Sequence, residues 1–136
     1  MKSRNLVFVG ALMGAVVLGS PVMAGMTSTV PVEVLLNADA SGQAQGSMPT
    51  ARFSANTVEF VGCGVRYSIT GTTVVRYGWC QATNSAGVYA ICNVTNNDLL
   101  NAVTALNDYS FIVFAWNAAG VCTRIGLSTQ SFYIPQ

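Results

Sequence analysis

The sequence of 136 residues contains no histidine, and 8% of its residues are charged. Its single lysine is Lys2, so the basic residues beyond position 24 are Arg52, Arg66, Arg76 and Arg124. Without histidine the chain lacks the usual general base of serine and cysteine hydrolases and a common ligand of metal ions. Four scattered arginines do not form the basic stripe that phosphate groups require. We therefore expect no nucleic-acid partner and no histidine metal site.

The acidic residues beyond position 24 form no pair that suits carboxylate catalysis. They are Glu33, Asp39, Glu59, Asp98 and Asp108. Together with the four arginines they leave a net charge near −1. The phosphate-binding G-x-x-x-x-G-K pattern is absent, and so are paired C-x-x-C elements. The sequence therefore predicts a protein that is not an enzyme and has no cofactor and no metal site.

The N-terminus has the organisation of a secretory signal peptide. Two basic residues lie within the first four, an apolar run follows from residue 6 to residue 18, and the small residue Ala24 ends the segment. The run is shorter than the roughly 20 residues of a membrane-spanning helix, so a signal peptide over residues 1–24 is favoured over a membrane anchor. We expect secretion to the periplasm or the extracellular space, with no membrane span.

All four cysteines follow the predicted cleavage site. An even number of cysteines in a secreted chain predicts two disulfides. Residues 79–94 have the pattern of a β-hairpin, and a three-residue loop would place Cys80 opposite Cys92. A non-hydrogen-bonded pair at this position would bring the two sulfurs within bonding distance. We expect Cys80–Cys92, which leaves Cys63–Cys122. The other pairings and a tetrathiolate metal site stay open.

Residues 25–51 precede the cysteine-containing part of the chain. Val30, Val32 and Val34 alternate with other residues as in a strand with one buried face. Pro31 cannot donate a hydrogen bond to a neighbouring strand, so we expect an edge strand. Residues 37–51 are small, polar and glycine-rich, which predicts a flexible linker. The strand could pack on its own domain or be donated to a neighbouring subunit.

Residues 52–136 form the predicted disulfide-bonded β domain. Alternating apolar positions predict strands at residues 57–70, 72–82, 88–94, 109–117 and 121–133. A helical stripe of Leu99, Val103 and Leu106 predicts a helix at residues 95–107. This order resembles the OB-fold, a small five-stranded barrel with Greek-key topology. The resemblance implies a mainly β protein with one α-helix between strands 3 and 4 of the barrel, and the alternative is a small β-sandwich with one helix.

Two short runs extend the resemblance. W-C-Q-A-T-N-S-A-G begins at residue 79, and A-W-N-A-A-G-V-C-T begins at residue 115. With the cysteine strand and the helix between them, they resemble small secreted, disulfide-bonded bacterial domains with an OB-like order of elements. This resemblance implies a fold and no functional site.

Barrels of the OB type bind oligosaccharides or strands of nucleic acid on the face of strands 2 and 3 and in the adjoining loops. The strand at residues 72–82 carries Arg76, Tyr77 and Trp79, which we expect to be the binding residues. The alternative is that these aromatic rings belong to the core. The sequence favours a secreted, non-catalytic binding module with a glycan or protein ligand.

Two further functions stay open. A structural subunit of an extracellular assembly would use the N-terminal strand, and the weakly charged surface would permit self-association. A secreted inhibitor or antimicrobial factor would need little more than a rigid disulfide scaffold.

Overall fold

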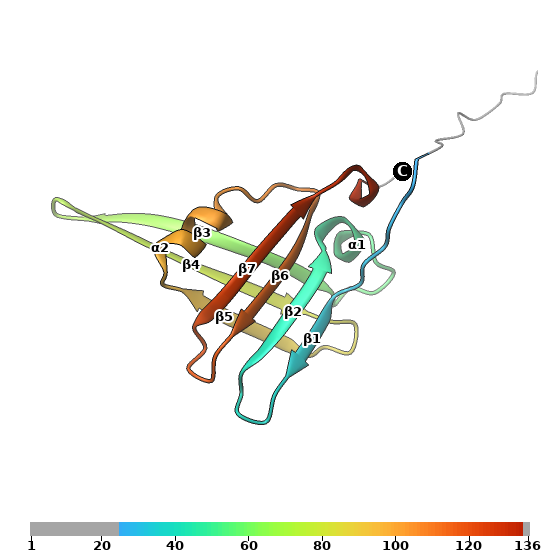
Figure 1. The fold of residues 1–136 in the computed structure, drawn as a ribbon, viewed down its shortest axis with the longest axis horizontal. Coiled ribbons are helices and arrows are strands. Elements are labelled where there is room, and N and C mark those ends of the chain that lie inside the picture. The colour runs from blue at the N-terminus through green and yellow to red at the C-terminus, as the bar shows by residue number, and fades with distance from the viewer. Residues whose placement is uncertain (1–24, 135–136) are drawn as a thin grey trace, which may run out of the picture.

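The computed structural model of the chain describes residues 25–134, so the predicted signal peptide lies outside the described residues. Two antiparallel sheets are stacked on each other, and their strands cross in the view of Figure 1. The first sheet has the order β1-β2-β6-β7 and consists of β1 (Glu33–Leu36), β2 (Gly42–Ser47), β6 (Ser110–Trp116) and β7 (Cys122–Thr129). The second has the order β3-β4-β5 and consists of β3 (Phe60–Thr70), β4 (Thr73–Thr83) and β5 (Tyr89–Val94).

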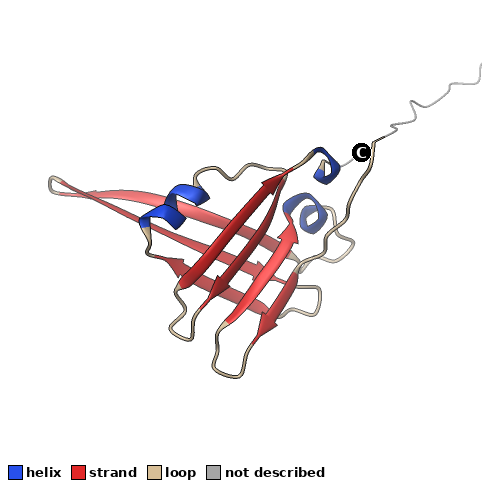
Figure 2. Cartoon of the chain, in the orientation of Figure 1, coloured by secondary structure: helices blue, strands red, loops and turns tan. Residues whose placement is uncertain are grey.

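Short helical segments lie at the margins of the sheets (Figure 2). They are α1 (Met48–Arg52), α2 (Asn97–Val103) and the 3-10 helix η1 (Ser131–Tyr133). The side chain of Asn96 caps α2 by accepting hydrogen bonds from the first backbone N–H groups of the helix, and Leu100 and Val103 attach the helix to the core. Within residues 25–134, none of the helices is long and apolar enough to cross a membrane.

The core lies between the two sheets. Along β6 every second residue is buried, as the alternating pattern predicts, and Ile112 and Phe114 have no exposed surface. The second sheet contributes small side chains such as Cys80 and Ala82, which are also fully buried. These residues of the two sheets belong to one buried cluster.

The mainly β class and the order of elements from β3 to β7 are confirmed, with α2 between the third and fourth of these strands. The closed five-stranded barrel is wrong, because seven strands form two separate sheets. Between β5 and β7 the described backbone pairing consists of one parallel bridge, Asn93 with Val121, and the Asn93 N–H donates to the Gly120 carbonyl (2.9 Å). The sandwich alternative is closer to the observed architecture.

The segment expected to be a flexible linker contains β2 and α1, which corrects that prediction. β2 pairs with β1 on one side and with β6 on the other, so it lies inside the sheet. Its small residues are needed for packing. A Cβ on Gly42 would collide with the Leu35 carbonyl oxygen and the Trp116 ring, and one on Gly46 would lie 3.0 Å from the Val32 side chain. The glycine-rich composition that is typical of linkers is here explained by a strand whose neighbours leave little space for side chains.

The predicted N-terminal edge strand is confirmed as β1, which follows Pro31 at the edge of the first sheet. It packs on its own domain, because Val32 and Val34 are buried in the core. The Val32 N–H donates to the Glu59 carboxylate (3.1 Å), which connects the segment to the start of β3. Residues 25–51 are therefore an integral part of this fold.

The β1–β2 turn is held by side-chain hydrogen bonds. The hydroxyl and the backbone N–H of Ser41 both donate to Asp39, and these bonds hold the pKa of the Asp39 carboxyl below its usual value. The stabilisation is therefore present above the usual carboxyl pKa and is lost as the pH falls through the lowered value. Ala40 has a positive φ of 66°, and its carbonyl accepts a hydrogen bond from the Trp116 indole (2.9 Å).

The disulfides join Cys63 to Cys80 and Cys92 to Cys122, so the predicted pairing is wrong. The first disulfide lies within the β3–β4 hairpin. The second joins the end of β5 to the start of β7 and therefore links the two sheets covalently.

The predicted hairpin register is nevertheless confirmed, because Cys80 lies opposite Cys92 and the Asn84 N–H donates to the Val88 carbonyl (3.1 Å). Hydrogen-bonded and non-hydrogen-bonded pairs alternate along antiparallel strands. Asn84 and Val88 form a hydrogen-bonded pair, and Cys80 and Cys92 lie an even number of positions farther along the two strands. Cys80 and Cys92 are therefore also a hydrogen-bonded pair, in which the side chains are farther apart than in a non-hydrogen-bonded pair. Cys63 lies on the other side of β4, with its Cα 4.0 Å from that of Cys80, and it forms the bond instead.

Loss of the Cys92–Cys122 disulfide in the variant Cys92→Ala/Cys122→Ala is expected to lower the free energy of unfolding by about 3 to 4 kcal/mol. This disulfide closes a loop of 30 residues and joins the two sheets. The matched control is Cys63→Ala/Cys80→Ala, which opens a separation of 17 residues inside a paired hairpin and should cost less. Urea unfolding of both variants measures the difference, and a larger loss in the control would contradict the assignment.

Candidate functional site

One side of the β3–β4–β5 sheet faces away from the core and carries several aromatic rings. Directly opposed residues on neighbouring strands point to the same side of a sheet. Cys80 and Ala82 point into the core, so the residues that alternate with them along β4, and their partners on the neighbouring strands, point outward. We call this side the outer face and define it by Phe60, Gly62, Gly64, Arg66, Tyr77, Trp79, Gln81, Thr83, Tyr89, Ile91 and Asn93.

One aromatic pair lies at the end of the outer face where β3 begins. Phe60 and Tyr89 flank Thr83 on the two neighbouring strands, and their ring centroids are 6.2 Å apart. The rings cover Thr83, which explains why a threonine on this face is buried. Both rings remain exposed, at 39% for Phe60 and 49% for Tyr89.

A second aromatic pair lies farther along β4. The Tyr77 and Trp79 ring centroids are 6.3 Å apart. The indole of Trp79 lies across Gly64 of β3, where a Cβ would come within 2.9 Å of the ring. The Arg66 guanidinium lies over the same indole, with its carbon 5.3 Å from the ring centroid, which is a cation–π contact. Glycine and arginine of β3 thus hold the indole in place against the sheet.

Between the two aromatic pairs the outer face is lower. Gly62 has open space above it, and its neighbour Gln81 receives a weak hydrogen bond from the Tyr89 hydroxyl (3.4 Å). Trp79 and Thr83 are four residues apart on β4, which corresponds to about 14 Å along a strand. The outer face is therefore an elongated surface with a ring pair near each end, and Gln81 and the exposed Ile91 lie between them.

The structure brings two of the three predicted binding residues together on this face, Tyr77 and Trp79. Arg76 points to the opposite side of the sheet, which follows from strand alternation. Its two guanidinium nitrogens donate to the side-chain oxygens of Asn101 (2.8 Å) and Asn97 (3.0 Å) in α2. Arg76 therefore attaches α2 to the hairpin and does not belong to the outer face, whereas Arg66 does.

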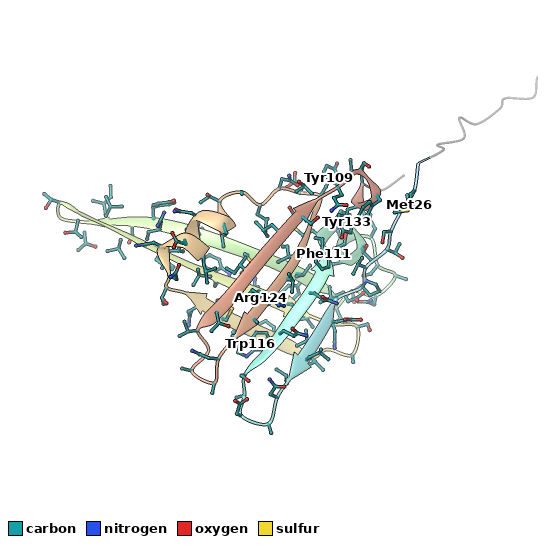
Figure 3. All side chains as sticks on the ribbon, viewed as in Figure 1. Met26, Tyr109, Phe111, Trp116, Arg124 and Tyr133 are labelled. Atoms are coloured by element: carbon teal, nitrogen blue, oxygen red, sulfur yellow. A yellow bond between two sulfur atoms is a disulfide. The ribbon has the colours of Figure 1, made fainter. Side chains whose placement is uncertain are left out.

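Two other residues lie away from this face. Figure 3 shows Arg124 on β7 of the first sheet, where it donates to Gln43 (3.4 Å). Trp116 is 6% exposed and belongs to the core. The outer face therefore draws its aromatic residues from β3, β4 and β5 alone.

The sequence reasoning missed several outer-face residues, among them Phe60, Tyr89, Gln81 and Asn93. The sequence contained a signal for three of them. The predicted register with Cys80 opposite Cys92 also places Asn93 opposite Trp79, and it puts Gln81 and Tyr89 on the same face of the sheet as Trp79. Phe60 could not be placed in this way, because its register depends on the β3–β4 pairing.

Two apolar hollows lie beside α1. The larger has a volume of about 430 Å³ and lies between the N-terminal segment, α1 and η1, with Phe53 and Tyr133 in its wall. The smaller, of about 350 Å³, is bounded by Phe53 and Tyr109. Within residues 25–134 there is no group of three or more acidic or cysteine side chains that could hold a metal ion.

The chain was compared with protein-family models, with curated protein sequences and with solved structures. None of the three comparisons finds a match.

The variant Gly64→Ala is expected to displace the Trp79 indole, because the new Cβ would lie 2.9 Å from the ring. The matched control is Gly62→Ala, on the same face of the same strand, where nothing lies within 4 Å. Near-ultraviolet circular dichroism and tryptophan fluorescence should change in the first variant and stay as in the wild type in the second. Unchanged spectra in both variants would contradict the described position of the indole.

The variant Arg76→Ala is expected to destabilise the protein by about 1 kcal/mol, because it removes two solvent-accessible hydrogen bonds to α2. Urea unfolding measures this loss. The double variant Asn97→Ala/Asn101→Ala should cost a similar amount, and adding Arg76→Ala to it should cost little more. Fully additive losses would show that Arg76 acts elsewhere.

Proposed function

We propose that this protein is a secreted, non-catalytic binding module whose ligand is an oligosaccharide. The observation that carries the proposal is the elongated outer face, with an aromatic pair near each end, of which the Trp79 indole is half-buried and the other three rings are exposed. Secretion is supported by the predicted signal peptide and by the two disulfides, which form in oxidising compartments.

The chemistry of the outer face suits a sugar chain. Tyrosine and tryptophan offer an apolar ring with a polar edge, and they suit ligands that are neither fully apolar nor charged. The side-chain amides of Gln81 and Asn93 and the guanidinium of Arg66 lie beside the rings, and each can bond to hydroxyl groups. Gly62 leaves room between the pairs for a ligand to approach the sheet. A flat strand surface of this kind can hold several linked sugar units lengthwise.

A protein ligand is the alternative for the same face. Tyr, Trp and Arg are also the residues enriched at protein interfaces. The oligosaccharide is favoured because the exposed rings form two separated pairs, whereas a protein hot spot is usually one central cluster surrounded by polar residues.

A structural subunit of an extracellular assembly is a second candidate function. Its original support was an N-terminal strand available for donation to a neighbour. That strand is β1 of this domain, and its buried residue Val34, with Val32 just before it, would have to leave the core before the strand could be donated. The binding module needs no such rearrangement, so we prefer it.

The proposal is tested with an array of soluble bacterial, plant and animal oligosaccharides, followed by calorimetry on the glycans that bind. Trp79→Ala and Tyr89→Ala each remove a ring from one pair and should weaken binding tenfold or more, a change of about 1.4 kcal/mol. The matched control is Tyr109→Ala, because Tyr109 is as exposed (47%) as Tyr89 (49%) but lies near α1.

Binding that falls in both outer-face variants and persists in the control supports the proposal. Binding lost only in Tyr109→Ala would move the site to the hollows beside α1. A protein with no affinity for any glycan, but with a protein ligand lost on Trp79→Ala, would establish the protein-binding alternative.

A further inference from the structure

The outer part of the β3–β4 hairpin projects beyond the other sheet as a long arm (Figure 1). We define the arm as residues 66–77. On its core-side face Ile69 is 74% exposed, Val74 62% and Tyr67 58%. These side chains continue the apolar row of the core to a place where no other described strand covers them. A two-stranded ribbon of this kind is only marginally stable in water without further contacts.

The two edges of the arm differ. Along β4 the edge is occupied by β5 as far as Gly78, and farther out Arg76 ties it to α2. Along β3 the edge is free, because β4 is the only strand of residues 25–134 that pairs with β3. Proteins usually protect long edge strands with lysine, proline or a bulge. β3 contains no lysine or proline, and its pairing with β4 runs without a register shift.

The alternation of pair types identifies which backbone groups of the arm are available. Cys63 and Cys80 have the short Cα separation of a non-hydrogen-bonded pair, 4.0 Å. Tyr67 and Ile69 lie an even number of residues farther along β3 than Cys63, so each of them also forms a non-hydrogen-bonded pair with its partner on β4. Their N–H and C=O groups therefore point away from β4 to the free edge. The edge thus presents unpaired donors and acceptors next to exposed apolar side chains.

We propose that the free edge of β3 pairs with the same edge of a second copy of this chain, as an antiparallel, twofold-symmetric dimer centred on Ser68. This register places Tyr67 of each copy opposite Ile69 of the other. Both residues present their backbone groups outward, so each pair exchanges hydrogen bonds across the edge. An aromatic ring opposite a β-branched residue is also a favourable cross-strand pair.

The low charge of the chain permits a second copy as the occupant, and the position of Arg66 selects the register. Arg66 is the one charged residue of β3, and centring the pair on Ser68 sets it opposite Thr70 of the second copy. The two Arg66 side chains are then four residues apart, about 14 Å, which exceeds the screening length of about 8 Å at physiological salt. Registers centred on residues 65, 66 or 67 would bring the two arginines close together. The small net charge of the chain adds little repulsion between copies.

A lipid bilayer is a less suitable partner for the arm. Unpaired backbone groups are costly in hydrocarbon, and the β3 edge would bring a row of them. Ser68, Thr70 and Thr73 also place hydroxyl groups on the outer side of the arm near its tip. A second β-strand satisfies the backbone groups, whereas a bilayer or an apolar groove does not.

The mass of the purified, oxidised protein in solution, measured by light scattering over a concentration series, tests the dimer. The decisive variant is Ile69→Pro, which removes an outward N–H from the β3 edge and should leave a monomer at every concentration. The matched control is Val74→Pro. Val74 is the cross-strand partner of Ile69, but its N–H points to the opposite edge of the arm, so the dimer should persist. Circular dichroism and the thermal midpoint confirm that both variants fold.

Cross-linking tests the register even if the proline variants misfold. The variant Ser68→Cys should form a covalent dimer under mild oxidation, because the two Ser68 residues face each other as a close, non-hydrogen-bonded pair. Thr72→Cys, at the tip of the arm, should form far less.

A dimer lost in Ile69→Pro and kept in Val74→Pro, together with efficient Ser68→Cys cross-linking, supports the proposal. A wild-type monomer at all concentrations overturns it, and so does binding of the monomer to phosphatidylcholine–phosphatidylglycerol vesicles through the arm. Equal loss of the dimer in both proline variants would assign association to the apolar face, which also overturns edge pairing. None of these results depends on whether the outer face binds a glycan.

Discussion

The corner between β5 and β7 constrains the rest of the molecule. There the Cys92–Cys122 disulfide and the hydrogen bond from Asn93 to Gly120 fasten the second sheet to the first. A domain of this size buries a limited core, so a covalent link between its layers adds a large share of its stability. With β5 anchored at this corner, β3 becomes the far edge of its sheet. Its outer half is then free to extend as the arm.

Strand β4 determines where binding chemistry can occur. Its residues alternate between two environments, so Arg76 and Cys80 face inward while Tyr77 and Trp79 face outward. The inward residues attach α2 and form a disulfide, whereas on the outward side Tyr77 is exposed and Trp79 is half-buried. One strand therefore serves both the stability of the fold and the proposed binding surface. The near absence of charged side chains leaves amides, hydroxyls and aromatic rings as the chemistry of the outer face.

Part of the fold could be predicted from local patterns. The order of elements from β3 to β7, the β4–β5 register and the edge position of β1 depend on alternation, turn chemistry and one proline, all of which act over a few residues. The candidate site was predicted in part for the same reason, because side chains alternate along β4 and this alternation places Tyr77 and Trp79 on the same face. The same alternation places Arg76 on the opposite face, which the choice of residues 76, 77 and 79 as one site overlooked.

The sequence by itself determined the mainly β class, the position of α2 and the presence of a cysteine opposite Cys80, since each follows from local periodicity or spacing. The tertiary structure decided which of two neighbours Cys80 bonds, because strand pairing on both sides of β4 made Cys63 the closer partner. It also decided that residues 42–47 form an inner strand, since the need for glycine arises from Trp116, more than seventy residues away. Contacts between distant segments have no signature in the local pattern, and they turned an expected barrel into two stacked sheets.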